Sequence, residues 1–155
     1  MSDIRVTYVD VYVLRGTGDA VEALVLRRVR AGRCPGAWES VHGSIEPGET
    51  PVAAALRELL EEAGLVPARL YNLSRVEAFY RHQQDLVALI PVFVALVPAG
   101  AGVRLSAEHD AFEWLPPAEA MARMAWPRER RALEDAVALL AGGDAGPVED
   151  VLRVC

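Results

Sequence analysis

The sequence has few cysteines, no long apolar run and no excess of positive charge, and each of these features argues against a class of protein. Its two cysteines, Cys34 and Cys155, have neither metal-ligand spacing nor the pattern of a disulfide framework, so we expect a reducing, cytoplasmic setting. The longest apolar run, residues 86–98, is too short to span a bilayer. No charged and then apolar leader opens the chain, so we expect no signal peptide.

The charge balance argues against nucleic-acid and membrane partners. The net charge is −6 and the pI is about 5.1, which disfavours binding to duplex nucleic acid and supplies no basic patch for an anionic membrane. A glycine-rich phosphate loop of the P-loop type is also absent, and no Ser-His-Asp arrangement follows from the spacing. At 155 residues, we expect a single domain over residues 1–155 with one sizeable core.

Alternation of apolar residues and breakers predicts a mixed α and β protein. We expect strands over residues 4–15, 21–29, 69–80, 86–97 and 112–115, the first two forming a hairpin. Helices are expected over residues 50–63, 117–124 and 127–140. For the breaker-rich tail, residues 142–155, a flexible and a docked state both stay open. Strands with helices within and after them indicate an α/β or α+β sandwich.

The most informative segment runs from Gly43 to Leu65 and reads GSIEPGETPVAAALRELLEEAGL. In a helix over residues 50–63, Glu58, Glu61 and Glu62 are related as i, i+3 and i+4 and share one face. The apolar residues fall on the opposite side, as in a core-facing helix. Three carboxylates on one face repel one another unless a cation lies between them, and hard oxygen ligands favour Mg²⁺ or Mn²⁺ over zinc.

A solvated acidic face is the alternative reading of these glutamates, and the flanking residues argue against it. Thr50 is suited to an N-cap, Pro51 to the first helical position, and Gly64 to the residue that ends the helix. A Pro-Gly turn with further carboxylates precedes the helix. The pattern therefore predicts a loop, a helix and a glycine stop, with the acidic face beside the loop.

The segment resembles the box of the Nudix (MutT-like) hydrolase family, whose pattern is G, five residues, E, seven residues, then R-E-U-x-E-E-x-G-U with U aliphatic. The matching residues are Gly43, Glu49, Arg57, Glu58, Leu59, Glu61, Glu62, Gly64 and Leu65. No defined position is missing. The resemblance implies an α/β/α sandwich around a central mixed sheet.

The resemblance also implies roles for the box residues. Glu58 and Glu62 would be the principal ligands of Mg²⁺ or Mn²⁺, and Glu61 would be a third ligand or the general base. Many members bring a further acidic residue from a late loop, and Glu108 is the best candidate by position and type, although an exposed loop glutamate is the alternative. Arg57 would hold a box carboxylate in a fixed orientation.

Candidates for substrate binding lie outside the box. Arg27 and Arg28 end the second expected strand, and alternation sends them to opposite faces, so one of them could reach substrate phosphates. Trp38 and Tyr80 are candidate stacking platforms for a base, with packing in the core as the alternative for each.

The function that the resemblance implies is metal-assisted hydrolysis of a diphosphate linkage in a small-molecule nucleoside polyphosphate. The stretch Trp38–Glu46 resembles the dihydroneopterin triphosphate and dNTP pyrophosphatases, and diadenosine polyphosphate hydrolases are nearly as similar. His42 replaces a glycine common in MutT-like enzymes. A nucleotide-sensing domain without turnover is the third alternative. Many relatives are dimers, so a homodimer is compatible with the resemblance.

Overall fold

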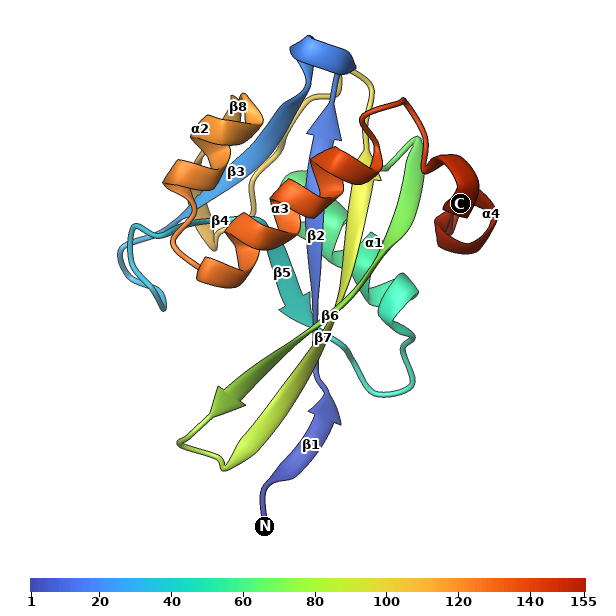
Figure 1. Ribbon diagram of the computed structural model, residues 1–155. Helices are drawn as coiled ribbons and strands as arrows, with labels where there is room; N and C mark the ends of the chain where they lie inside the picture. The colour runs from blue at the N-terminus through green and yellow to red at the C-terminus, as the bar shows by residue number, and fades with distance from the viewer.

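The computed structural model describes residues 1–155 and has one mixed sheet with helices on both faces (Figure 1). The strands are β1 (Asp3–Val6), β2 (Tyr8–Arg15), β3 (Glu22–Arg28), β4 (Trp38–Glu39), β5 (Val41–Ser44), β6 (Arg69–Arg81), β7 (Leu86–Leu96) and β8 (His109–Leu115). The α-helices are α1 (Pro51–Ala63), α2 (Pro117–Arg123), α3 (Pro127–Leu139) and α4 (Glu149–Leu152). Two 3-10 turns, η1 (Gly18–Ala20) and η2 (Gly146–Val148), complete the elements.

Strand β7 organises the sheet. It pairs in parallel with β1 and β2 and antiparallel with β6. Strand β2 also pairs antiparallel with β3 and β5, and β3 pairs antiparallel with β4 and β8. The sheet is therefore mixed, as expected for a sandwich of this kind.

Two apolar clusters cover the two faces of the sheet. On one face the small and apolar side of α1 packs against alternate residues of β2, including Val9, Val11 and Val13. On the other face Tyr12 and Leu14 of β2 pack against α3. This alternation follows from the period of two along a strand and gives the predicted α/β/α arrangement.

Most predicted elements are present, with three differences. The strand expected over residues 4–15 is two strands that separate at Thr7, whose amide bonds to Leu89 of β7 while its carbonyl accepts from Ile45. Strands β4 and β5, before α1, were not predicted because they are only two and four residues long. Helix α4 was not predicted either.

The tail takes the docked alternative of the two that the sequence leaves open. Leu152 is buried in the cluster under α3. The amide of Val154 donates to the carbonyl of Leu70 at 2.8 Å, and the amide of Leu70 donates to the carbonyl of Cys155 at 3.0 Å. The end of the chain thus adds to the edge of β6.

Candidate active site

Helix α1 begins and ends with the predicted caps. The hydroxyl of Thr50 accepts a hydrogen bond from the amide of Ala53 at 3.2 Å, and Pro51 occupies the first turn. Gly64 ends the helix in the left-handed region, with φ of 67°, and its amide donates to carbonyls of the last turn. Residues other than glycine rarely adopt this backbone conformation. These caps fix the length of the helix that carries the box glutamates.

Gly43 allows the acidic face of α1 to lie directly against β5. A Cβ atom at Gly43 would lie 1.9 Å from Cδ of Glu58. A side chain at this position would displace the carboxylate of Glu58, so glycine is required for that carboxylate to lie where it does. The first glycine of the box therefore has a steric role.

Arg57 connects the acidic residues of the box. Its Nε and Nη2 donate to the two carboxylate oxygens of Glu49 at 2.8 and 2.9 Å. Its Nη1 donates to Glu58 at 2.8 Å and to Glu61 at 3.2 Å. Its Nη2 also donates to the carbonyl of Ser44 at 2.8 Å, which ties α1 to the end of β5. Hydrogen bonds from Arg57 lower the pKa of Glu49 to about 2.

Glu62 is the most perturbed carboxylate of the site. It is 3% exposed, and its Oε2 accepts a hydrogen bond from the amide of His42 at 3.3 Å. Burial, and then repulsion from Glu58, raises the pKa of Glu62 to about 9. Burial also raises the pKa of Glu58, against the opposing effect of Arg57. The ionised forms of these two carboxyl groups are therefore poorly compensated by the neighbouring arginine.

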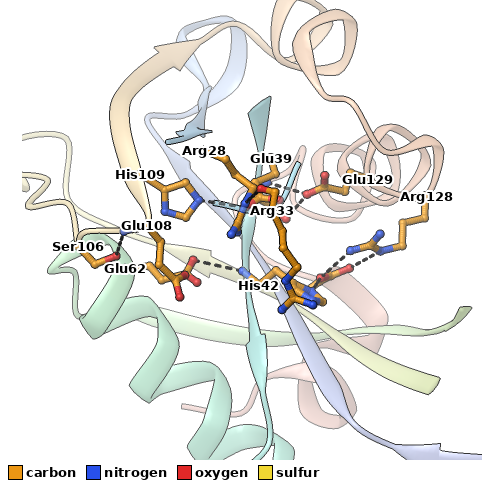
Figure 2. A network of polar contacts seen from close by, with 12 residues as sticks. Arg28, Arg33, Glu39, His42, Glu62, Ser106, Glu108, His109, Arg128 and Glu129 are labelled. Atoms are coloured by element: carbon orange, nitrogen blue, oxygen red, sulfur yellow. Dashed lines mark hydrogen bonds and ion pairs between the residues drawn. The ribbon is translucent and has the colours of Figure 1, made fainter. Parts of the chain in front are cut away.

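Glu108 comes to the site from the loop before β8. Its charge contributes to the raised pKa of both Glu58 and Glu62, and its amide donates a hydrogen bond to the hydroxyl oxygen of Ser106 at 3.3 Å. The fold therefore brings Glu108 beside the two box glutamates, from which it is separated by more than forty residues of sequence. Figure 2 shows Glu108 and Glu62 on the same side of the network.

The donors fit a hard divalent cation. The candidate ligands are carboxylate oxygens, and burial followed by repulsion between carboxylates raises the pKa of Glu62, a cost that a bound cation would offset. The side chains as they lie do not yet form a coordination shell, because no group of three or more acidic, His or Cys side chains converges on one point. Two of the candidate ligands, Glu58 and Glu61, turn toward Arg57 instead.

A cavity of about 280 Å³ lies beside this acidic cluster. Four arginines and two histidines line it, together with four aromatic side chains; these residues are Arg28, Arg33, Arg81, Arg128, His42, His82, Tyr8, Phe79, Tyr80 and Trp126. Glu39 is the acidic residue in this lining. In a chain with a net charge of −6, the concentration of arginine at this cavity favours an anionic ligand with an aromatic part.

The structure separates the two arginines at the end of β3. Arg28 lines the cavity, and its Nη1 donates to Glu39 at 3.0 Å while its Nε donates to the carbonyl of Arg33 at 2.6 Å. Arg27 points away and pairs with Asp110 at 2.7 Å. A register shift in the pairing of β3 with β8 falls between the two residues. Arg28 is therefore the one placed to reach a ligand.

The two aromatic candidates also differ in position. Tyr80 borders the cavity, and its hydroxyl donates to Asp85 at 2.9 Å. Trp38 is not among the residues that line this cavity, and its assignment to substrate binding stays a prediction. It packs against the apolar cluster under α3, with Arg123 at 4.9 Å from the ring centroid. Trp38 is thus partly buried at the edge of this cluster.

A buried network behind the cavity was not predicted. Asp10 is fully buried on β2; Nδ1 of His42 lies 2.6 Å from its Oδ1, and Nε of Arg128 donates to its Oδ2 at 2.9 Å. Burial acts to raise the pKa of Asp10, but the contacts with His42 and Arg128 outweigh it and hold that pKa below its usual value. Figure 2 shows His42 between Glu62 and Arg128. His42 thus joins the two parts of the site, with its amide on Glu62 and its ring in the cavity.

One signal in the sequence could have revealed this network. Asp10 is a lone acid within the otherwise apolar strand YVDVYVLR, and a buried carboxylate needs a paired cation or hydrogen-bond donors. Its partners could not be identified in advance, because His42 and Arg128 are 32 and 118 residues away in the chain. The same holds for Glu39, which bonds to both Arg28 and His109.

Comparison with known proteins identifies the family through its domain model. The NUDIX domain model matches residues 5–136. An octanoyltransferase from Myxococcus xanthus is 37% identical over 137 residues, which cover 84% of this chain and 36% of that protein. An asymmetrical bis(5'-nucleosyl)-tetraphosphatase from Sus scrofa is 35% identical over 80 residues, covering 50% of this chain and 54% of that protein.

Among solved structures, the dihydroneopterin triphosphate pyrophosphohydrolase of E. coli is similar with a TM-score of 0.67 at 26% identity. The match covers 89% of this chain and 99% of that one. By contrast, the chain spans about a fifth to about half of the length of the curated relatives that it matches. None of the helices is long and apolar enough to cross a membrane.

Proposed function

Because this chain belongs to the Nudix family, we propose that it hydrolyses a diphosphate linkage in a nucleoside triphosphate or a related pterin triphosphate. The observation that carries this proposal is the adjacency of two unlike regions. A cluster of box carboxylates lies beside a cavity lined by arginines and aromatic rings. The first suits a cation and the second suits a phosphate chain attached to a planar ring system.

Each region has a defined part in the reaction. Mg²⁺ or Mn²⁺, held by Glu58 and Glu62 with Glu61 as a third ligand, would neutralise phosphate charge and lower the pKa of a bound water. Arg28 would bind phosphate oxygens with the guanidinium nitrogens that it does not use on Glu39. Glu108 would position the attacking water and accept its proton, with Glu61 as the alternative base.

Arg57 and His42 have positioning roles in this proposal. Arg57 fixes Glu49 and Glu58 relative to the end of β5, so the ligand set is oriented before substrate arrives. The ring of His42 is held against Asp10 and faces the cavity, close to the backbone that contacts Glu62. Strand β5 would therefore contact both the substrate, through the ring of His42, and the carboxylates of α1, through its backbone.

Dinucleoside polyphosphates are the second candidate substrates. Two aromatic pairs line the same cavity: Tyr8 and His42 have centroids 5.0 Å apart, and Phe79 and Trp126 have centroids 6.0 Å apart. Two pairs could accept two bases. The similarity to an asymmetrical tetraphosphatase supports the same alternative.

A substrate panel assayed with and without Mg²⁺ or Mn²⁺ separates these candidates. Pyrophosphate and a monophosphate from dNTPs or dihydroneopterin triphosphate would support the first proposal. Release of ATP and AMP from diadenosine tetraphosphate would support the second. Saturable binding without hydrolysis would identify a nucleotide-sensing domain and would contradict both.

Replacing Glu62 by Gln tests the metal assignment. The amide keeps the size of the side chain and removes its charge, so turnover should fall by more than ~100-fold, since even the outer partners of metal ligands are worth ~10–100-fold. Glu134→Gln, on the exposed face of α3, is the matched control and should leave turnover unchanged. Near-normal turnover of Glu62→Gln, with the fold intact by circular dichroism, would contradict the assignment.

A further inference from the structure

Three strands form an arm that extends beyond the helices. It consists of β1, the second part of β6 (residues 76–81) and the first part of β7 (residues 86–91). Figure 1 shows this arm projecting from the body of the molecule, with the N-terminus beside it. One face of the arm borders the cavity through Phe79, Arg81 and Ile90. The opposite face is called the outer face here.

The strand register defines the residues of the outer face. Val76 lies opposite Pro91 and Ala78 opposite Leu89 on the antiparallel pair. On the parallel pair Ile4 lies beside Val87, and Val6 lies beside Leu89. Directly opposed residues share a face of the sheet. The outer face therefore consists of Ile4, Val6, Val76, Ala78, Val87, Leu89 and Pro91. Tyr80, opposite Val87, lies beyond it at the tip, where it also borders the cavity.

Every side chain on the outer face is apolar, although the face is open to solvent. Ile4 is 66% exposed, Val6 52% and Val76 60%. A sheet with one solvated face normally has polar residues on that face. Here the charged residues of the same strands, including Asp3, Arg5, Glu77 and Arg81, lie on the other side by register. This inversion indicates that something apolar covers the outer face.

We propose that a second copy of this chain covers the outer face, the two arms packing face to face about a twofold axis. Such an interface is isologous, so the patch must be complementary to itself. A face with no charged side chain meets this condition, since no like charges are brought together. The open edge of β1 lies beside it and carries Asp3 and Arg5, which neutralise each other.

The size of the face also suits a second copy. Its residues amount to on the order of 500 Å², in the upper part of the range for the largest apolar patch of a monomer. Two such faces packed together would bury on the order of 1,000 Å² in total, the area at which a specific interface begins. Two sheets can pack in this way at the usual separation of roughly 10 Å.

Sedimentation velocity of the full chain at concentrations from about 1 to 100 µM tests the proposal. The wild-type chain should sediment as a dimer. Val76→Glu on β6 and Ile4→Glu on β1 each place a charge on the outer face, and each should weaken dimerisation by at least ~100-fold. Val66→Glu is the matched control, because Val66 is 71% exposed but lies outside the arm, and it should remain a dimer.

Circular dichroism and thermal melting show whether each variant is folded, and the two variants lie on different strands so that one can substitute for the other. A wild-type chain that is monomeric throughout this range would overturn the proposal. So would a dimer that persists in both folded variants. A monomer that sediments with phosphatidylcholine vesicles would assign the outer face to a lipid surface and would also overturn it.

Discussion

All sixteen basic side chains of this protein are arginines, and several of them act through the forked geometry of the guanidinium group. Arg57 binds both oxygens of Glu49, and Arg128 binds both oxygens of Asp10. A lysine has a compact ammonium group and cannot make such a bidentate pair. The same geometry suits phosphate oxygens, which is the use proposed for Arg28.

At the residue scale, Arg27 and Arg28 form a natural pair for mutation. Arg28→Ala should raise KM for the triphosphate substrate by ~10–100-fold, because a charge-assisted contact is worth about 1.5–3 kcal/mol. Arg27→Ala should leave KM within about twofold, because Arg27 pairs with Asp110 at the surface. Steady-state kinetics on both variants measures the difference. Equal effects on KM would contradict the assignment of Arg28 to the substrate.

At the scale of elements, α3 is joined to the strand segment before the box by a buried carboxylate. Oε2 of Glu129, which is fully buried on α3, accepts a hydrogen bond from the amide of Ser40 at 2.6 Å and another from its hydroxyl. Its other oxygen has no hydrogen-bond partner. Burial, and then repulsion from Asp10, raises the pKa of Glu129 to about 8. This contact positions Trp126 and Arg128 of the same segment over the cavity.

The raised pKa of Glu129 makes stability depend on pH in a defined direction. The folded chain keeps the proton up to pH about 8, whereas the unfolded chain loses it near its ordinary pKa of 4.5. The folded state therefore binds more protons between these values, and its free energy of unfolding falls as pH rises through them. Glu129→Gln keeps an acceptor for Ser40 and removes this titration.

We therefore expect Glu129→Gln to gain stability relative to the wild type as pH rises from 5 to 8, by on the order of a few kcal/mol. Glu62, which titrates in the same direction, is present in both chains and cancels in the difference. Urea denaturation at several pH values gives the measurement. A difference in unfolding free energy that is constant with pH would show that Glu129 titrates normally in the fold.

At the scale of the whole molecule, the two apolar clusters close the sheet on both faces, and the tail completes one of them. Leu152 is 7% exposed within the cluster under α3, whereas its neighbour Val151 is 80% exposed. The hydroxyl of Tyr71 on β6 donates to Glu149 of α4 at 3.0 Å. Helix α4 therefore packs against the rest of the fold through Leu152 and Glu149.

Leu152→Ala should lower the free energy of unfolding by roughly 2–5 kcal/mol, the usual cost of such a cavity. Val151→Ala, one residue earlier, should change it by less than about 0.5 kcal/mol because the side chain is in solvent. Denaturant melts of the two variants provide the comparison. If both substitutions cost the same small amount, the tail would not be docked in solution.

The arm adds a property that belongs to the whole molecule. Its outer face is the proposed dimer surface, and its other face lines the cavity. Dimerisation would therefore hold one wall of the cavity in place. The cavity wall and the proposed dimer surface thus share strands β6 and β7.

The local pattern of residues along the chain determined the acidic helix, its caps and most of the strands. Helix α1 starts and ends where Thr50, Pro51 and Gly64 predict, because capping and periodicity act over a few residues. The box spacing was enough to identify the family for the same reason: its residues are neighbours on one helix and one loop.

Only the tertiary structure decided which distant side chains meet. It placed Arg28 rather than Arg27 at the cavity, packed Trp38 against the cluster under α3, and joined Asp10 to His42 and Arg128. It also turned an apolar face of the arm outward. These outcomes depend on strand pairing and on packing between residues far apart in sequence, and such pairing is set by the energy of the whole fold rather than by any local pattern.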